Sequence, residues 1–355
     1  MKGKIVFVVP CLRSGGAERV MVLLANSLVE KGYETGFLFT MDDVVSYEPN
    51  KKVTITVNNG SRNPLGQIKF IREYMRRNKD SVYISFFTYQ NLYTLIAKLF
   101  LPVKVVVSER NDPRKTLYGR KKLELLRLVL YSDAYKVVFQ TEEAKRYFPN
   151  RIQKKGVLIS NPLSPDLPDI FRGESEKRVV AVARLNKQKN LPMLISGIAD
   201  FLKSYPEMCL EIYGEGDPRD PDMKSELIEL ASQKGICDQV KFKGFVHNVT
   251  EKIRSASIYV STSNYEGISN SMLEALAMGL PCICTDCPVG GARMFVKEGI
   301  NGYLVSVGDE RAFKDALYKV EFDNNMRTKC YEEAVELRKK LSVNAITEQW
   351  EKAIM

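Results

Sequence analysis

The amino-acid sequence predicts an α/β protein made of two doubly wound domains. Short apolar runs of strand length alternate with amphipathic helical segments in both halves of the chain. A chain of 355 residues is long enough for two domains of ordinary size. A proline-rich stretch at 161–168 interrupts the alternation near the middle, which is typical of a linker. We therefore expect one domain over 1–165, a second over 166–335 and a terminal helix over 336–355.

Apolar runs bounded by turn residues give the expected strands. In the first half they are 4–9, 35–39, 53–57, 82–87, 103–107, 136–140 and 157–160. In the second half they are 178–183, 208–213, 240–243, 257–261, 281–285 and 303–305. The last stretch has helical spacing of its apolar residues, namely Val335, Leu337, Leu341, Ile346, Trp350 and Ile354.

The composition is that of an ordinary globular protein, with 45% hydrophobic and 27% charged residues. No apolar run reaches the roughly 18 residues that a membrane-spanning helix needs. The N-terminal apolar run is short and breaks at Pro10, which favours a first buried strand over a signal peptide. We therefore expect a cytoplasmic protein.

Seven scattered cysteines fit a reducing compartment rather than a disulfide framework. Cys282, Cys284 and Cys287 are spaced closely enough to suggest a metal or redox site. However, Cys282 and Cys284 alternate with Ile283 in an expected strand, and no fourth ligand lies nearby in the sequence. We expect no metal site there.

The first half of the chain is strongly basic. Residues 1–165 hold 28 lysines and arginines against 14 acidic residues, whereas 166–355 hold 25 against 29. Basic stretches at 69–77 and 114–127 interleave cations with leucines and tyrosines, which suits an anionic membrane surface. An ordinary surface helix would show the same pattern, and nucleic acid would explain the charge, although no nucleic-acid-binding motif is present.

A segment from Ser261 to Gly291 combines a strand end, a polar loop, a short helix and a second strand. Ser269, Asn270 and Ser271 are capping residues at the predicted helix start, where free N–H groups and the helix dipole favour an anion. Two carboxylates, Glu266 and Glu274, flank this start. Because phosphates need N–H donors and sugar hydroxyls need acceptors, the combination suits a nucleotide sugar. Alternatively, Glu266 is a solvated loop residue, and Ser271 and Glu274 form a capping box.

Glycine-rich and basic loops follow other predicted strands. Gly15 and Gly16 open the first predicted helix, but the surrounding sequence lacks the G-x-G-x-x-G dinucleotide fingerprint. Arg184 and Lys189 are five residues apart in one loop, a spacing that lets both reach one diphosphate. Each of these loops could also be a strand–helix turn that binds no ligand.

The sequence Glu266-x7-Glu274, the following ALAMGLPCI and GINGYLV at 299–305 resemble the nucleotide-sugar signature of glycosyltransferase family 4. The resemblance implies a GT-B fold, in which two Rossmann-like domains face a cleft and the last helix crosses back to the first domain. It also implies a retaining glycosyltransferase. If Arg184 and Lys189 neutralise the leaving diphosphate, the reaction needs no metal ion or other cofactor.

The resemblance further implies a role for each matching residue. Arg184 and Lys189 would neutralise the leaving diphosphate, and Glu266 would hold the donor sugar, so these three are the catalytic candidates. The donor-binding candidates are Gly15, Gly16, Gly214, Gly216, Phe245, Val246, Ile268, Ser269, Asn270 and Glu274, the last one at the ribose. The candidates on the acceptor side are Arg19, Glu109, Arg110 and Asn111.

The sequence departs from the family at one position. Many members carry a histidine after the strand at 103–107, whereas this chain has Arg110, and its one histidine, His247, lies elsewhere. Arg110 or Asn111 could replace the histidine, or Arg110 could form a structural ion pair with Glu109.

The sequence therefore predicts a cytoplasmic enzyme peripheral to the inner face of the cell membrane. It would move a sugar from a nucleotide sugar, with UDP as the first choice of nucleotide, to a lipid-linked or growing glycan of a surface polysaccharide. The expected partners are this donor, the lipid-linked or oligosaccharide acceptor and an anionic membrane surface, with no nucleic acid. A sugar-nucleotide epimerase of the same architecture and a nucleic-acid-binding protein are the alternatives.

Overall fold

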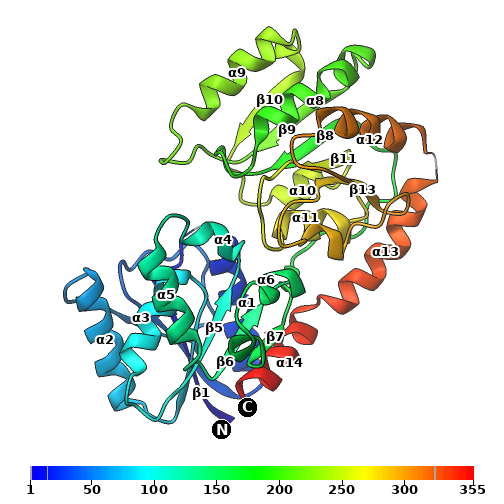
Figure 1. The fold of residues 1–355 in the computed structure, drawn as a ribbon. Helices are drawn as coiled ribbons and strands as arrows, with labels where there is room; N and C mark the ends of the chain where they lie inside the picture. The colour runs from blue at the N-terminus through cyan, green and yellow to red at the C-terminus, as the bar shows by residue number, and fades with distance from the viewer. Residues whose placement is uncertain (1, 14, 324) are drawn as a thin grey trace. The chain divides into compact units, whose positions relative to one another are not determined.

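The computed structural model describes residues 2–13, 15–323 and 325–355. The chain divides into two compact units: the first joins the residues up to Pro162 to Leu341–Met355, and the second is Leu163–Lys340. Each unit is a parallel β-sheet with helices packed on it (Figure 1). This confirms the predicted α/β class with two doubly wound domains.

The first unit is a seven-stranded sheet in the order β3-β2-β1-β4-β5-β6-β7. Its strands are β1 (Lys2–Val9), β2 (Tyr33–Phe39), β3 (Thr54–Val57), β4 (Ser81–Ser85), β5 (Lys104–Glu109), β6 (Lys136–Phe139) and β7 (Gly156–Leu158). Its helices are α1 (Gly16–Glu30), α2 (Pro64–Arg77), α3 (Thr88–Lys98), α4 (Pro113–Thr116), α5 (Lys121–Tyr131), α6 (Glu142–Arg146), α7 (Asn150–Gln153) and α14 (Val343–Ile354). The strand order reverses between β1 and β4, where the loops of an open α/β sheet diverge and leave room for a ligand.

The second unit is a six-stranded sheet in the order β10-β9-β8-β11-β12-β13. Its strands are β8 (Glu176–Val182), β9 (Cys209–Tyr213), β10 (Val240–Gly244), β11 (Ala256–Ser261), β12 (Cys282–Thr285) and β13 (Gly302–Val305). Its helices are α8 (Leu191–Ser204), α9 (Met223–Gln233), α10 (Val249–Ile253), α11 (Asn270–Ala277), α12 (Glu310–Phe322) and α13 (Met326–Lys340), with short 3-10 turns η1 (Cys237–Gln239) and η2 (Ala292–Met294). Here the order reverses between β8 and β11.

Each range predicted as a strand overlaps one of these strands. The prediction succeeds because parallel strands are covered on both faces and therefore appear as uninterrupted apolar runs. In β1, for example, Ile5–Val9 are all buried.

The C-terminal helix α14 packs in the first unit beside α1 (Figure 1). Its Trp350 is fully buried and stacks on Phe86, with the ring centroids 5.4 Å apart. Glu351 forms ion pairs with Lys2 at 3.3 Å and with Lys31 at 3.4 Å. The apolar spacing of the last segment therefore completes the core of the first unit.

The basic stretch at 114–127 divides between α4 and α5. Gly119 has a φ of +76° in the connection, a left-handed conformation that favours glycine. Arg127 was expected to contribute to a basic surface, but it is fully buried. Its Nη2 atom donates to Glu124 at 2.6 Å and to the Pro113 carbonyl oxygen at 2.9 Å. The predicted basic face is therefore wrong at Arg127, whose charge holds the two helices together.

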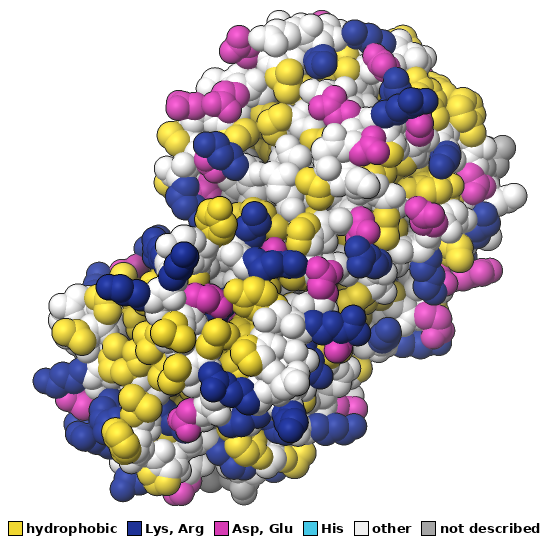
Figure 2. Space-filling model, in the orientation of Figure 1, with side chains coloured by type: hydrophobic (Ala, Val, Ile, Leu, Met, Phe, Trp, Pro, Cys, Tyr) yellow, Lys and Arg dark blue, Asp and Glu magenta, His cyan; other side chains and the backbone are white. Residues whose placement is uncertain are grey.

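The rest of α5 does present apolar side chains beside cations. Leu125 is 65% exposed and Val129 is 54% exposed, one and two turns after the exposed Lys121. Figure 2 shows hydrophobic side chains gathered on this part of the first unit, with lysines and arginines around them. No helix within the described residues combines the length and the apolar character needed to cross a membrane.

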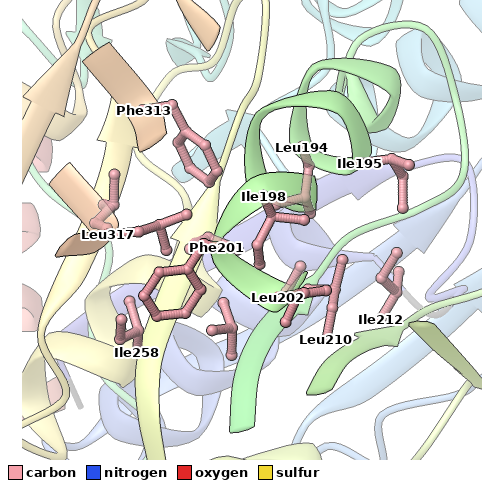
Figure 3. Packing of buried hydrophobic residues seen from close by; sticks show 14 of the residues in the cluster. Leu194, Ile195, Ile198, Phe201, Leu202, Leu210, Ile212, Ile258, Phe313 and Leu317 are labelled. Carbon is pink, nitrogen blue, oxygen red and sulfur yellow. The ribbon is translucent and has the colours of Figure 1, made fainter. Parts of the chain in front are cut away.

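The core of the second unit lies between α8 and the sheet (Figure 3). Apolar side chains at helical spacing on α8 contact Leu210 and Ile212 of β9 and approach α12. Gly197 allows this approach, since a Cβ atom there would lie only 2.8 Å from the Phe313 ring. Phe201 is fully buried, with Tyr318 edge-on at 5.3 Å between ring centroids.

Replacing Phe201 by alanine should lower the free energy of unfolding of the second unit by about 3–5 kcal/mol, because the change leaves a cavity in a packed core. Denaturant unfolding followed by circular dichroism measures this difference. The matched control is Phe322→Ala, since Phe322 is 69% exposed, and its effect should be about 0.5 kcal/mol. Equal losses in the two variants would contradict the assignment of Phe201 to the core.

Candidate functional site

The loop after β8 carries Arg184 and Lys189, the two cations predicted to bind a diphosphate. Arg184 is exposed and has no ion pair within the described part of the chain. Asn186 shapes the loop: its Oδ1 accepts a hydrogen bond from the Lys189 amide at 3.2 Å, and its Nδ2 donates to Asp217 at 3.0 Å. The loop after β8 is thus fastened to the loop after β9.

The structure brings Lys189 and Glu266 together as an ion pair between the loops after β8 and β11. The two side chains are only 16% and 21% exposed. The loops are also joined by the Asn264 amide, which donates to the Gln188 carbonyl at 2.8 Å, and by the Thr262 hydroxyl, which donates to the Lys189 carbonyl at 3.1 Å. The resemblance assigns these two residues to different parts of one substrate, and no sequence motif indicates that they pair.

The same edge of the sheet carries the start of α11. Ser269 is its N-cap residue, and its hydroxyl accepts a hydrogen bond from the Met272 amide at 3.4 Å. Ile268 and Asn270 flank the cap. The first amides of a helix have no carbonyl partners within it, so this terminus suits an anion.

The capping-box alternative for Glu274 is wrong. Because Ser269 is the N-cap residue, the third helical position belongs to Met272, and Glu274 is the fifth residue of the helix. A capping-box glutamate must sit at the third position to reach back to the cap. Glu274 is only 3% exposed, so it is a buried residue in the middle of α11 rather than at its N-terminal end.

Two glycines allow the loops of this edge to approach each other closely. A Cβ atom on Gly214 would lie 2.0 Å from the Ala183 carbonyl oxygen, and Gly214 has a φ of +143°. A Cβ atom on Gly291 would lie 1.7 Å from the Gly267 carbonyl oxygen. Any side chain at either position would push apart the loops that hold Arg184 and Glu266.

The loops after β9 and β10 carry the predicted donor-binding residues Gly214, Gly216, Phe245 and Val246. The Gly214 amide donates to the Gly244 carbonyl at 2.8 Å, which joins them. Gly216 has open space around it, and Phe245 is 47% exposed. Val246 borders a cavity of about 480 Å³ whose wall also contains Tyr213. Phe245 therefore presents a partly exposed aromatic ring at this corner of the sheet.

A small cavity lies directly under the Glu266 loop. Its volume is about 10 Å³, and its lining includes Glu266, Ser269, Cys284 and Cys287. Burial raises the pKa of Cys284 well above its usual range and that of Cys287 to about 12. Both thiols are therefore protonated at neutral pH, and the thiolate form binds metals. Within the described residues no group of three or more histidines, cysteines or carboxylates is placed to hold a metal ion.

In the first unit, Gly15 and Gly16 stand at the start of α1, where Gly15 is the N-cap residue in an extended conformation. The Arg19 amide donates to the Gly15 carbonyl at 3.1 Å, and the Arg19 residue is half-buried. Ser14 lies outside the described residues. The glycine turn therefore places Arg19 in the first turn of α1, at the carboxyl end of β1.

Glu109, Arg110 and Asn111 follow one another at the end of β5 but have separate environments. Glu109 is 2% exposed, accepts a hydrogen bond from the Tyr131 hydroxyl and lies 3.8 Å from Arg127. The alternative of a Glu109–Arg110 pair is therefore wrong. Asn111 accepts a hydrogen bond from the Asp112 amide at 2.8 Å, in the turn before α4.

Arg110 contacts residues that sequence analysis did not associate with it. Its Nη1 atom donates to Asn161 Oδ1 at 2.6 Å, and its guanidinium carbon lies 4.0 Å above the centre of the Phe86 ring. The centre of the Trp350 ring lies 5.7 Å from the same guanidinium carbon. In the sequence, Asn161 stands out only as part of the proline-rich linker. No sequence pattern connects Phe86, Arg110, Asn161 and Trp350.

Residues 167–337 match the family described as glycosyl transferases group 1. The chain is 28% identical over 373 residues to GalNAc-alpha-(1->4)-GalNAc-alpha-(1->3)-diNAcBac-PP-undecaprenol alpha-1,4-N-acetyl-D-galactosaminyltransferase of Campylobacter jejuni, covering 99% of this chain and 98% of that protein. It is 25% identical to the lipopolysaccharide core biosynthesis glycosyltransferase LpsE of Rhizobium meliloti, over 95% of both chains.

Solved structures show the same fold. The Anabaena protein HepE in complex with UDP has a TM-score of 0.82 at 17% identity and 99% coverage of both chains. The sucrose-phosphate synthase of Thermosynechococcus elongatus has a TM-score of 0.83 at 16% identity, with 99% of this chain and 98% of that chain covered. At these identities the likeness concerns the fold. Together with the family match, these similarities identify the chain as a glycosyltransferase with the two parallel-sheet domains of the GT-B fold.

Proposed function

We propose that the protein is a retaining, family 4 glycosyltransferase that moves a sugar from a UDP-sugar to a lipid-linked or growing glycan acceptor. One observation carries the proposal: Arg184, the Lys189–Glu266 pair and the start of α11 meet at one edge of the second sheet. The Campylobacter relative, whose name contains an undecaprenol-linked diphosphate, and the Anabaena structure with UDP support these substrates. Surface-polysaccharide synthesis fits the Rhizobium relative, which is named as a lipopolysaccharide core biosynthesis glycosyltransferase.

In this proposal, fixed positive charge stabilises the departing nucleotide. Arg184 supplies a guanidinium that forks onto phosphate oxygens, Lys189 supplies a point charge, and the amides at Ser269 and Asn270 donate hydrogen bonds. These groups act where negative charge develops, so the proposed reaction requires no metal ion. A front-face displacement, in which the departing phosphate assists the acceptor hydroxyl, would retain the anomeric configuration.

The Lys189–Glu266 pair gives this scheme a resting state. Without a donor, each charge neutralises the other in a largely buried position. An arriving diphosphate offers Lys189 a second partner and leaves Glu266 free to accept hydrogen bonds from sugar hydroxyls. Glu274 would bind the two ribose hydroxyls in the same manner, while Gly214, Gly216, Phe245 and Val246 would surround the base.

The acceptor would bind to the basic first unit, with Gly15, Gly16, Arg19, Arg110 and Asn111 nearest to it. The buried network around Glu109 would hold the end of β5 in place. We also propose that α5 contacts the inner face of the cell membrane through Leu125 and Val129, with Lys121 and Lys122 near anionic headgroups. Arg127 is excluded from this face because it is buried.

The proposal is tested by incubating the purified protein with a panel of UDP- and GDP-sugars and an undecaprenyl-diphosphate-linked glycan. The expected product is a glycan extended by one sugar in α-linkage, the anomer that retention gives from an α-linked donor. An epimerised sugar nucleotide formed without any acceptor would contradict the proposal.

Arg184→Ala and Lys189→Ala should each lower kcat/KM by roughly 100-fold or more, since each removes one group that stabilises transition-state charge. Steady-state transfer assays measure the loss, and thermal unfolding should be nearly unchanged. Lys187→Ala is the matched control: Lys187 lies in the same loop and is 84% exposed, so its activity should stay near the wild-type value. Near-normal turnover in either site variant would remove the diphosphate assignment.

Glu274→Gln should weaken UDP binding by about 10-fold, because the amide keeps one acceptor oxygen but replaces the other by a donor. Isothermal titration calorimetry measures the affinity, and the melting temperature is recorded in parallel. A lower melting temperature together with unchanged UDP affinity would show that Glu274 serves only the packing of α11.

Replacing Lys121 and Lys122 by glutamine should reduce binding to vesicles that contain anionic lipid by roughly 10- to 30-fold, at about 1 kcal/mol for each cation. Sedimentation with vesicles measures the partitioning. The control changes Lys51 and Lys52, which are also exposed in the first unit, to glutamine. Equal losses in both double variants would show general charge attraction and reject α5 as the contact.

A further inference from the structure

Among the described residues, Arg110 is a half-buried cation without a counter-ion, and it lies at the ligand-binding edge of the first sheet. It follows β5 directly, and β5 lies between β4 and β6 in the sheet. The carboxyl ends of parallel strands are where open α/β sheets bind ligands. Within the described residues, no carboxylate lies within ion-pair distance of Arg110, and the adjacent Glu109 is held by Tyr131 and Arg127. Burial alone lowers the pKa of Arg110 to about 9.

The guanidinium is held firmly on two sides. Phe86 covers one face at 4.0 Å, and the stacked pair of Phe86 and Trp350 continues this apolar wall. Asn161 Oδ1 accepts a hydrogen bond from Nη1 and a second one from Gln140 Nε2, at 2.6 and 2.8 Å. The orientation of the guanidinium is therefore set by an aromatic face and one polar anchor.

The opposite edge of the guanidinium lacks partners. The Nε and Nη2 atoms of Arg110 are both buried and have no hydrogen-bond partner among the described residues. Nε1 of Trp350, in the same cluster, is also buried without a partner. Arg127 is fully buried, Arg178 and Arg327 are half-buried, and each of these three arginines leaves a single such nitrogen. Because unsatisfied buried donors are costly, two on one cation indicate a missing ligand.

The chemistry of this edge specifies the class of ligand. Nε–H and Nη2–H point in parallel and form the fork that binds two oxygens of a phosphate or carboxylate. A neutral hydroxyl would use only one of the two donors. In a chain that handles diphosphates, the oxyanion of that shape is a phosphate.

We propose that Arg110 binds a phosphate oxyanion of a substrate through Nε and Nη2. The proposal rests on the proposed function, which provides two sources: the diphosphate of the lipid-linked acceptor and that of the nucleotide sugar. Arg110 is then a substrate-binding residue, and Phe86, Asn161 and Trp350 are the residues that position it.

The protein contains its own reporter for this site. Trp350 is the single tryptophan of the chain, and its ring lies 5.7 Å from the guanidinium carbon of Arg110. A phosphate bound to Arg110 should change the fluorescence of this indole. Trp350→Phe should abolish the signal, which identifies its origin.

The test titrates the full-length protein with farnesyl diphosphate, as a soluble prenyl diphosphate, and separately with UDP. Tryptophan fluorescence and calorimetry give the dissociation constants. Arg110→Lys keeps the charge but loses the fork, so it should raise the dissociation constant of at least one probe by about 10-fold or more. A loss confined to farnesyl diphosphate identifies the acceptor as the source, and a loss confined to UDP identifies the donor.

Two further variants distinguish a loss of phosphate binding from a loss of folding. Asn161→Asp leaves Arg110 intact but places a carboxylate at its anchor, so it should weaken phosphate binding in the same direction. Arg327→Lys is the control. Like Arg110, Arg327 is a half-buried arginine, but it donates to the Ala256 carbonyl at the amino end of β11, so its variant should bind both probes normally.

This inference is overturned if Arg110→Lys and Asn161→Asp both bind the two probes with unchanged dissociation constants. Because UDP still binds in that case, the proposed function stands. A wild-type protein that binds neither probe would overturn both.

Discussion

The adjacency of β8 and β11 in the second sheet is the constraint on which the candidate site depends. These two strands are far apart in sequence but are paired in parallel register, with Ile258 opposite Val179. Their carboxyl ends therefore deliver Lys189 and Glu266 to the same point, and the reversal of strand order there opens space for a ligand. The ion pair, the start of α11 and the loop around Arg184 all follow from this one pairing.

Close backbone packing holds these loops in place. Gly214 and Gly291 each stand where a side chain would collide with a carbonyl oxygen of a neighbouring loop. Asn186 bonds to both Lys189 and Asp217, and hydrogen bonds from Arg219 keep the pKa of Asp217 well below its usual range. A charged loop fixed in this way loses little conformational freedom when an anion binds, which is the condition for electrostatic stabilisation of a leaving group.

Two arginines of the first unit use their charge differently. In the first unit, Arg127 neutralises Glu109 and Glu124, so this cluster serves stability. Arg110 directly follows Glu109, the last residue of β5, but faces an aromatic wall and an amide instead. Adjacent residues at the end of one strand project to opposite sides, and this alternation separates a structural charge from a charge available to a ligand.

The sequence by itself determined the α/β class, the positions of the strands and the capped start of α11, because these depend on local apolar runs and capping residues. It also supplied the cations and carboxylates of the candidate site as separate motifs. Tertiary structure decided which of them meet: Lys189 pairs with Glu266, Glu274 is a helix-interior residue, Arg127 is buried, and Arg110 lies beside Phe86 and Trp350. The physical reason is that these contacts join residues far apart in sequence and depend on strand order, which leaves no periodic signal in a single chain.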